Sequence, residues 1–226
     1  MTLPEVAAVV LLLGVVMGFV LQSVATYERA ATGGIRRLEN LGEARVLMAV
    51  MSKDIRTATK LDAATPPFVV SSGDPMVLLA DDNELTFYAN LNMTTSCPKI
   101  IHLYVNSDRE LIEDVTPPSG GAPPDCTYPT DPAATRTRLV GQYVANDLED
   151  PTQAMFTYYY CDATGALTAF TTDQTPLSLA DGLLVEAVGI HLAIRKDTSL
   201  PVADTTLVNR VRLPNVNFNP PPSPSP

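Results

Sequence analysis

The chain begins with an almost purely apolar stretch. From Val6 to Leu21 no residue carries a charge or a strong hydrogen-bonding side chain, and small or apolar residues flank this run on both sides. With its flanks the stretch approaches the roughly 20 residues that a helix needs to cross a bilayer. We therefore expect residues 1–31 to form a transmembrane helix or a helix in the core of a filament.

A second apolar pattern follows, now with helical spacing. Apolar residues recur every three or four positions, which places them on one face of a helix and predicts that this face packs on a globular head. The helix is expected to continue through residues 32–65 and to be closed by Pro66 and Pro67. The stripe consists of Leu38, Leu41, Ala44, Met48, Met51, Ile55 and Ala58.

Four glycines interrupt these helical patterns. Gly33 and Gly34 lie between the two halves, where each costs about 1 kcal/mol of helix stability relative to alanine. We interpret this pair as a hinge, a kink or a locally melted turn. Gly14 and Gly18 form a second weak stretch inside the apolar run, and their spacing also fits close approach of another helix.

Beyond Pro67 the pattern changes to the two-residue alternation of β-strands. Turn-rich breaks separate neighbouring strands, so hairpins are expected. The prediction is an α+β fold, with a long N-terminal helix packed on an antiparallel β-sheet head at residues 66–218 and a proline-rich tail at 219–226. His191 falls on the outer face of the last strand. The expected strands are 76–80, 84–89, 99–105, 110–115, 138–144, 154–160, 166–170 and 183–194.

Charge narrows the possible partners and topology. The 25 acidic and 15 basic residues give a net charge of −10, so no specific nucleic-acid partner is predicted. A removable secretory signal needs a basic start, whereas Glu5 is the first charge and Arg29 the first base. The positive-inside rule would place Arg29, Arg36 and Arg37 in the cytoplasm, yet the head looks exported. A short basic leader, cut away before Met1, would remove this conflict.

The first residues carry a more specific signal. Thr2, Leu3 and Glu5, followed by the apolar run, resemble the start of a mature type IV pilin. Met1 stands where that family usually has Phe, and Pro4 fills the variable position. Pro is tolerated at the start of a helix, because its missing N–H would be unpaired there. More diffusely, the head resembles J-type pseudopilins, W-type minor pilins and the long pilin-like proteins of Gram-positive bacteria, in segments such as 85–91 and 185–197.

The resemblance implies a processing and assembly route. A prepilin peptidase removes the leader, the new amine of Met1 is methylated, and Glu5 neutralises the Met1 amine of a neighbouring subunit. A buried carboxylate is tolerated only beside a cation. The implied partners are identical or related pilin subunits, the prepilin peptidase and the pilus assembly machinery. The chain would reside in the cytoplasmic (inner) membrane before assembly and in an extracellular pilus afterwards.

Three functions stay open at this stage. The first is a structural pilin of a type IV pilus, with adhesion, motility or DNA uptake undetermined. The second is a minor pilin or a pseudopilin resembling those of type II secretion, at a filament tip. The third is an extracytoplasmic binding domain or enzyme on a membrane anchor. Acid pairs such as Asp81-Asp82 face opposite sides of a strand and make poor catalytic dyads. We therefore expect no enzyme, no catalytic, cofactor-binding or metal-binding residue, and no cofactor.

Three cysteines and some modification signals complete the sequence. The hairpin 99–105/110–115 brings the chain back toward Cys97 before the proline-rich loop 116–136, which contains Cys126. Cys97–Cys126 is therefore the preferred disulfide, with Cys161 as the partner in either alternative pairing. Asn92 begins a glycosylation sequon. Ser223 and Ser225 offer O-glycosylation sites in the tail.

Overall fold

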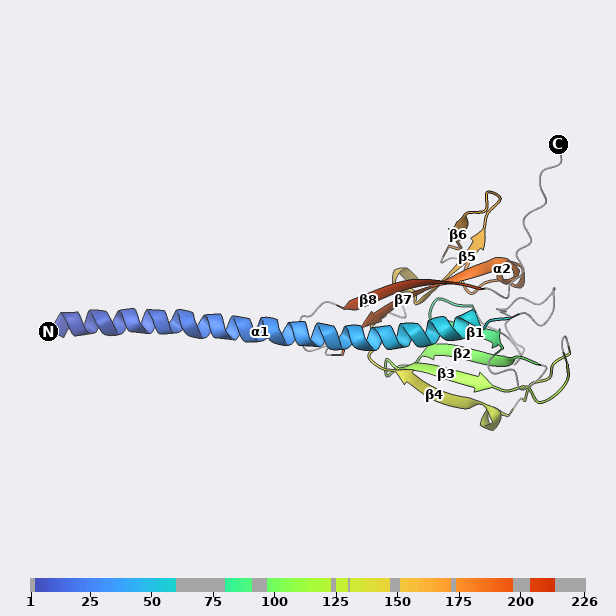
Figure 1. Cartoon of the computed structure of the whole chain (residues 1–226), viewed down its shortest axis with the longest axis horizontal. Helices are drawn as coiled ribbons and strands as arrows, with labels where there is room; N and C mark the ends of the chain where they lie inside the picture. Colours follow the sequence, from blue (N-terminus) through green and yellow to red (C-terminus); the bar gives the residue numbers. More distant parts are fainter. Residues whose placement is uncertain are drawn as a thin grey trace.

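One long helix dominates the molecule. The computed structural model describes residues 3–59, 80–90, 97–122, 125–129, 131–146, 151–171, 174–196 and 204–213. Helix α1 runs from Leu3 to Arg56 over 54 residues, about 81 Å at 1.5 Å per residue. Its first half projects from the head as a free rod, and its second half lies within the head (Figure 1). The helix ends at Arg56, earlier than predicted. Pro66 and Pro67 lie outside the described residues and do not set this end.

The helix passes through its central glycines without a break. Gly33 and Gly34 keep α-helical backbone, so the predicted kink or locally melted turn is wrong for this conformation. A Cβ atom built on either residue would meet nothing within 4 Å, and the same is true of Gly14 and Gly18. Packing in the single chain therefore does not explain these four glycines. Flexibility at these positions stays a prediction.

The head contains two four-stranded antiparallel sheets. The first follows the chain order β1-β2-β3-β4, and the second has the order β6-β5-β7-β8. The fold is therefore α+β, as predicted. The first sheet consists of β1 (Glu84–Ala89), β2 (Lys99–Val105), β3 (Leu111–Thr116) and β4 (Arg136–Gly141). The second consists of β5 (Phe156–Cys161), β6 (Leu167–Ala169), β7 (Val185–Ile194) and β8 (Thr205–Arg212).

Most of the predicted strands are present, with some differences at their ends. β1 and β2 have the predicted bounds, and β3 to β7 are shifted or shortened by a few residues. Residues 183–184 belong to a short helix, α2 (Leu179–Leu184), whose N-cap Ser178 accepts a hydrogen bond from the Asp181 amide. In the segment 76–80, Ala80 forms an isolated bridge with Leu85, and residues 76–79 lie outside the described ranges. β8 was not predicted.

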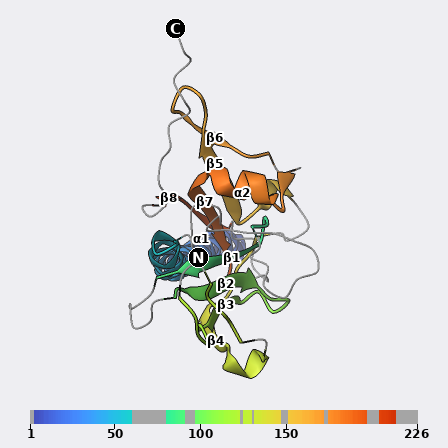
Figure 2. The same ribbon diagram turned by 90° about the vertical axis from the view of Figure 1, so that its right-hand side faces the viewer.

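The second half of α1 lies between the two sheets (Figures 1 and 2). Leu47, Met51 and Ile55 are fully buried there, together with Phe87 from the first sheet and Tyr158 from the second. This arrangement allows one helix to contribute to a core that both sheets share. Burying a large apolar side chain in such a core contributes about 1.5–3 kcal/mol.

The predicted stripe is largely correct but begins too early. Ala44, Met48, Met51, Ile55 and Ala58 are buried as expected, whereas Leu41 is only half-buried and Leu38 is 71% exposed. The head first covers the helix at Asn40, so Leu38 lies before the covered segment. Leu47, which was not predicted, is fully buried instead.

An arginine ties the two sheets together at one end. The Nε of Arg109, in the β2–β3 turn, donates to the Val144 carbonyl at 2.6 Å, and its Nη2 donates to the Arg195 carbonyl at 3.0 Å. Val144 also bridges to Ile194, at the end of β7. The head therefore behaves as one unit around the helix.

Candidate functional site

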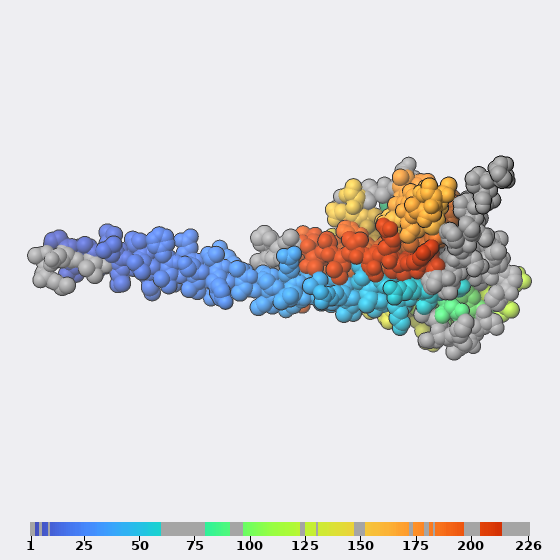
Figure 3. Space-filling view, turned by 45° about the horizontal axis from the view of Figure 1, so that its top comes forward, coloured from blue at the N-terminus to red at the C-terminus, as the bar shows by residue number. Residues whose placement is uncertain are grey.

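The free rod of α1 is the most unusual surface of the chain. Its most apolar 18-residue window has a mean hydropathy of 2.4, and none of this window is buried. By length and composition this helix is able to cross a membrane. Contiguous apolar surface of this size on a soluble monomer marks an interaction or membrane surface. The space-filling view shows the bare rod extending away from the head (Figure 3).

The rod is apolar around its whole circumference. Val10, Leu11, Leu12 and Leu13 are 62%, 68%, 64% and 68% exposed, and four successive helical residues point in four different directions. A helix that is hydrophobic all round is stable only where apolar groups surround it, in a membrane or inside a bundle of helices. The rod is therefore built to be enclosed on every side.

The boundary between rod and head is fixed by polar contacts. Asn40 is buried, and its Oδ1 accepts a hydrogen bond from the Lys196 amide at 3.3 Å. The Lys196 ammonium lies 3.7 Å from the Glu39 carboxylate. A few residues further along, the helix approaches β4 so closely that a Cβ on Gly141 would lie 2.2 Å from the Leu47 Cδ2. These contacts hold the rod in a set direction relative to the head.

Exposed apolar side chains are also present further along α1, toward and within the half that packs on the head. Ile35, Leu38 and Val46 are 59%, 71% and 58% exposed. At 100° per residue they lie on the side of α1 opposite the buried Leu47 and Met51. The helix therefore offers two apolar faces here. One packs on its own head, and the other has no cover from the described parts of the chain.

The predicted disulfide is confirmed. Cys97 and Cys126 are joined, and with Tyr88, Tyr128 and Ile100 they form a small second core beside the main one. The Tyr128 hydroxyl donates to the Pro98 carbonyl at 3.0 Å, which anchors the loop. Disulfides persist in oxidising compartments. Together with the apolar helix, this bond indicates a membrane-anchored or secreted protein whose head lies outside the cytoplasm.

The third cysteine is in a reduced state. Cys161, half-exposed at the end of β5, donates its Sγ hydrogen to Glu186 Oε2 at 3.0 Å. This hydrogen bond to a carboxylate raises the pKa of the thiol, which keeps the sulfur protonated and weakly nucleophilic. His191, on β7, is half-exposed, as expected for the outer face. That the chain is not an enzyme stays a prediction.

A group of charged residues between the helix and the first sheet was not predicted from the sequence. Asp54 on α1 and Glu113 on β3 are almost fully buried, and Arg138 on β4 pairs with Glu113 through its guanidinium. Arg138 Nη2 lies 3.8 Å from Asp54 Oδ2. Burial, followed by repulsion from Glu113, raises the pKa of Asp54 to about 6, against the lowering effects of Arg138 and Lys53. An acid on the buried face of an amphipathic helix was the available signal.

Some of the predicted site residues lie outside the described part of the chain. Met1, Asn92, Ser223 and Ser225 lie outside the described residues, as does the side chain of Glu5. The backbone of Glu5 belongs to the first turns of α1. In the described ranges, no group of three or more His, Cys, Asp or Glu side chains is arranged to hold a metal ion.

The architecture is pilin-like. A long apolar N-terminal helix projects from a head of antiparallel sheets, and its second half packs against those sheets. No known protein family matches the sequence, and no curated protein matches it. The likeness therefore rests on the helix, the head and the first five residues.

Proposed function

We propose that this chain is a structural subunit of a type IV pilus or a related filament, polymerised through its N-terminal helix. The observation that carries the proposal is the free rod, apolar on every side and continuous with the helix on which the head is built. Many such rods packed side by side would form a filament core, with the heads outside.

The length of the helix favours a filament over a simple anchor. The apolar core of a bilayer is about 30 Å thick, whereas α1 measures about 81 Å. If the run from Val6 onward spans the membrane, the exposed Ile35, Leu38 and Val46 lie beyond it. A single-span anchor has no need for a second apolar face in water. A bundle of staggered helices would cover this face.

Two interactions would stabilise the assembled rods: packing between helices and a charge pair between neighbouring subunits. A rod that leaves lipid for a helix bundle gains little hydrophobic energy, because lipid tails are as apolar as leucine. Van der Waals contact at small residues such as Gly14 and Gly18 would contribute, and the Glu5 carboxylate would pair with the Met1 amine of a neighbouring subunit. A prepilin peptidase, the assembly machinery and the cytoplasmic membrane are the further partners that this route requires.

A minor pilin or a pseudopilin at a filament tip is the second candidate. The head of two four-stranded sheets favours it, because the head segments resemble those of J-type pseudopilins and W-type minor pilins, the larger members of the family. Both candidates use the same rod, so the number of copies per filament separates them. Subunit counting by quantitative mass spectrometry of sheared filaments would assign the role.

The proposal is tested by placing a charge in the rod. Val16→Asp puts a carboxylate at a residue that would be enclosed in a filament, and we expect the sheared surface fraction to lose this chain. The matched control is Leu139→Asp, which adds the same charge at a half-exposed residue of β4. Immunoblots of sheared and cell fractions report both variants. Equal shedding of Val16→Asp and wild type, or absence of wild-type chain from the sheared fraction, would contradict the proposal.

A further inference from the structure

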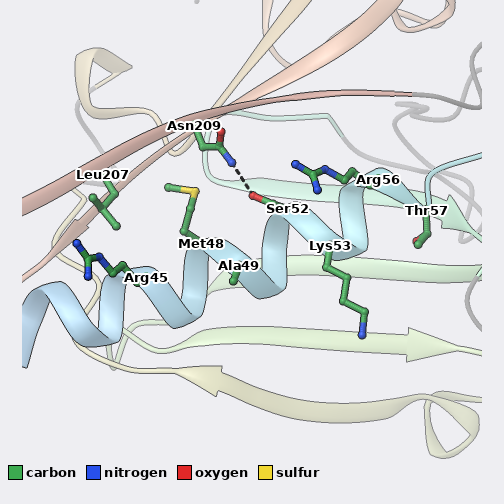
Figure 4. Close-up of a pocket in the computed structure, with 9 residues that line it drawn as sticks. All are labelled: Arg45, Met48, Ala49, Ser52, Lys53, Arg56, Thr57, Leu207 and Asn209. Carbon is green, nitrogen blue, oxygen red and sulfur yellow. Dashed lines mark hydrogen bonds between the residues drawn. The ribbon is translucent and has the colours of Figure 1, made fainter.

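An open groove runs between α1 and β8 on the head. It has a volume of about 620 Å³. Met48, Ala49 and Leu207 supply its apolar part, and the Asn209 Nδ2 donates to the Ser52 Oγ at 2.8 Å across it. Figure 4 shows the β8 side chains reaching down toward the helix from above. The groove therefore has a built polar link and an apolar lining.

Three cations line the same groove. Arg45, Lys53 and Arg56 all come from the exposed side of α1. No ion pair or hydrogen bond within the described parts of the chain uses their charged groups. Three arginines elsewhere on the head are different, because Arg109 in the β2–β3 turn, Arg138 on β4 and Arg195 after β7 all have acceptors.

The rest of the chain has the opposite charge. Residues 57–226 carry 20 of the 25 acidic residues and nine of the 15 basic ones, a net charge of −11. Residues 1–56 carry five acidic and six basic residues, a net charge of +1. Heads of neighbouring copies would therefore repel one another unless their acids met a basic surface, and this groove is such a surface.

We propose that the groove binds an acidic segment from the head of a second copy of this chain. The inference rests on the proposed function, because it supplies a head-to-helix contact between neighbours in a filament. The contact is heterologous: a groove on one copy receives a different surface of the next. Contacts of this type, when the rotation does not close, generate open helical filaments rather than closed pairs.

The spacing of the cations favours a peptide segment over a small anion. Arg45 and Arg56 are eleven residues apart on one helix, about 16 Å along its axis. An extended segment of about five residues spans this distance at 3.3 Å per residue. A single phosphate would reach one end of the groove and leave the apolar part unused. A segment with acids between apolar residues would match both.

Zero-length cross-linking tests the contact directly. A carbodiimide joins a lysine amine to a carboxylate only where the two touch, and Lys53 is one of four lysines in the chain. Filaments assembled from an equal mixture of ¹⁴N and ¹⁵N full-length chains distinguish links between copies from links within one copy. We expect a mixed-isotope peptide that joins Lys53 to an acid in residues 57–226. Lys99, outside the groove, serves as the internal comparison.

Charge reversal in the groove is the second test. Arg45→Glu with Lys53→Glu should reduce filament yield at least tenfold at low salt. Lys99→Glu with Arg136→Glu, an equal charge change on the first sheet, should leave the yield within twofold. If filaments form normally in the first variant, and wild-type filaments carry no mixed-isotope link at Lys53, the inference is wrong and the proposed function stands. If the variant loses only binding to DNA or anionic vesicles, the groove serves a polyanion and the inference is also wrong. If wild-type chains assemble into no filaments, the proposed function itself fails.

Discussion

Asp54 is an acidic residue in a buried environment that disfavours its charged form. Its carboxylate lies between α1 and the first sheet, beside the equally buried Glu113, and one cation serves both. Within the described structure, Asp54 Oδ2 is buried and makes no hydrogen bond. Because Arg138 lies much closer to Glu113 than to Asp54, the helix acid receives the weaker share of that charge. Burial therefore dominates, and the pKa of Asp54 rises to about 6.

The raised pKa predicts how stability depends on pH. Between the ordinary value of 3.8 and about 6, the folded chain binds a proton at Asp54 that the unfolded chain has released. The stability contribution of this group is therefore present at acidic pH and is lost as pH rises through that window. Asp54→Asn should flatten this part of the profile and raise stability at pH 7 by about 1 kcal/mol after solvent screening.

Urea unfolding of the full chain in mild detergent, followed by tyrosine fluorescence, would measure both effects. Asp181→Asn, which changes an acid outside this buried group, is the control and should leave the pH profile unchanged. Lower stability of Asp54→Asn at pH 7 would show that the attraction of Arg138 outweighs burial.

At the scale of elements, the packing of α1 on β4 depends on a residue without a side chain. A Cβ at Gly141 would approach the Cδ2 and Cγ of Leu47, at 2.2 and 2.9 Å. Leu47 is fully buried and has little room to move. Gly141→Ala should therefore destabilise the head by about 1–3 kcal/mol.

The matched control for this packing is Gly42→Ala. Gly42 is exposed on the same helix, and an added Cβ meets nothing within 4 Å. Its replacement should be neutral or stabilise the helix by up to about 1 kcal/mol. Urea unfolding of both variants measures the difference. Equal unfolding midpoints for Gly141→Ala and wild type would contradict this expectation. They would mean that α1 and β4 move apart to accommodate the added Cβ at little cost in free energy.

The disulfide is a second determinant at this scale. It closes a loop with a sequence separation of 29 residues, and such a loop typically contributes about 3–4 kcal/mol by restricting the unfolded chain. Cys97→Ala with Cys126→Ala should lower stability by that amount and expose residues 116–129 to proteolysis. Cys161→Ser should do neither. Limited proteolysis with mass spectrometry of the fragments separates the two, and an unchanged fragment pattern in the double variant would contradict the loop's dependence on the bond.

The elements also show what the sequence was able to predict. β1 and β2 follow strong alternation with clear turns, and their bounds were predicted correctly. β8 was missed because its inward positions include two polar residues, the buried Thr205 and Asn209, whose Nδ2 donates to Ser52 on the helix. Leu38 fitted the helical spacing but lies before the head begins, and spacing alone does not reveal where a tertiary contact starts. The groove, and the group around Asp54, join segments far apart in sequence and were not predictable from local patterns.

At the scale of the whole molecule, the two halves of α1 have different roles. The first half forms the exposed rod, and the second half builds the head. Residues 3–39 are almost wholly exposed, whereas residues from Asn40 onward build the core. Changes near the N-terminus should therefore alter assembly without unfolding the head. This separation makes the role of Glu5 testable.

Glu5→Ala should leave the head folded and block assembly, because the carboxylate that would pair with a neighbour's Met1 amine is lost. The free energy of unfolding of the full chain in detergent should match that of wild type within about 0.5 kcal/mol. Electron microscopy of sheared surface material should show no filaments. Normal filaments from this variant would refute the charge pairing while leaving assembly by helix packing in place.

If α1 forms the core of a polymer, its rods should lie at the axis of the filament. An electron-microscopic helical reconstruction of filaments sheared from cells that express the chain would show where they lie. We expect a bundle of α-helices at the axis, formed by residues 3–39 of successive copies, with the two-sheet heads outside. Filaments that lack this chain, or heads at the axis with the rods exposed, would contradict it.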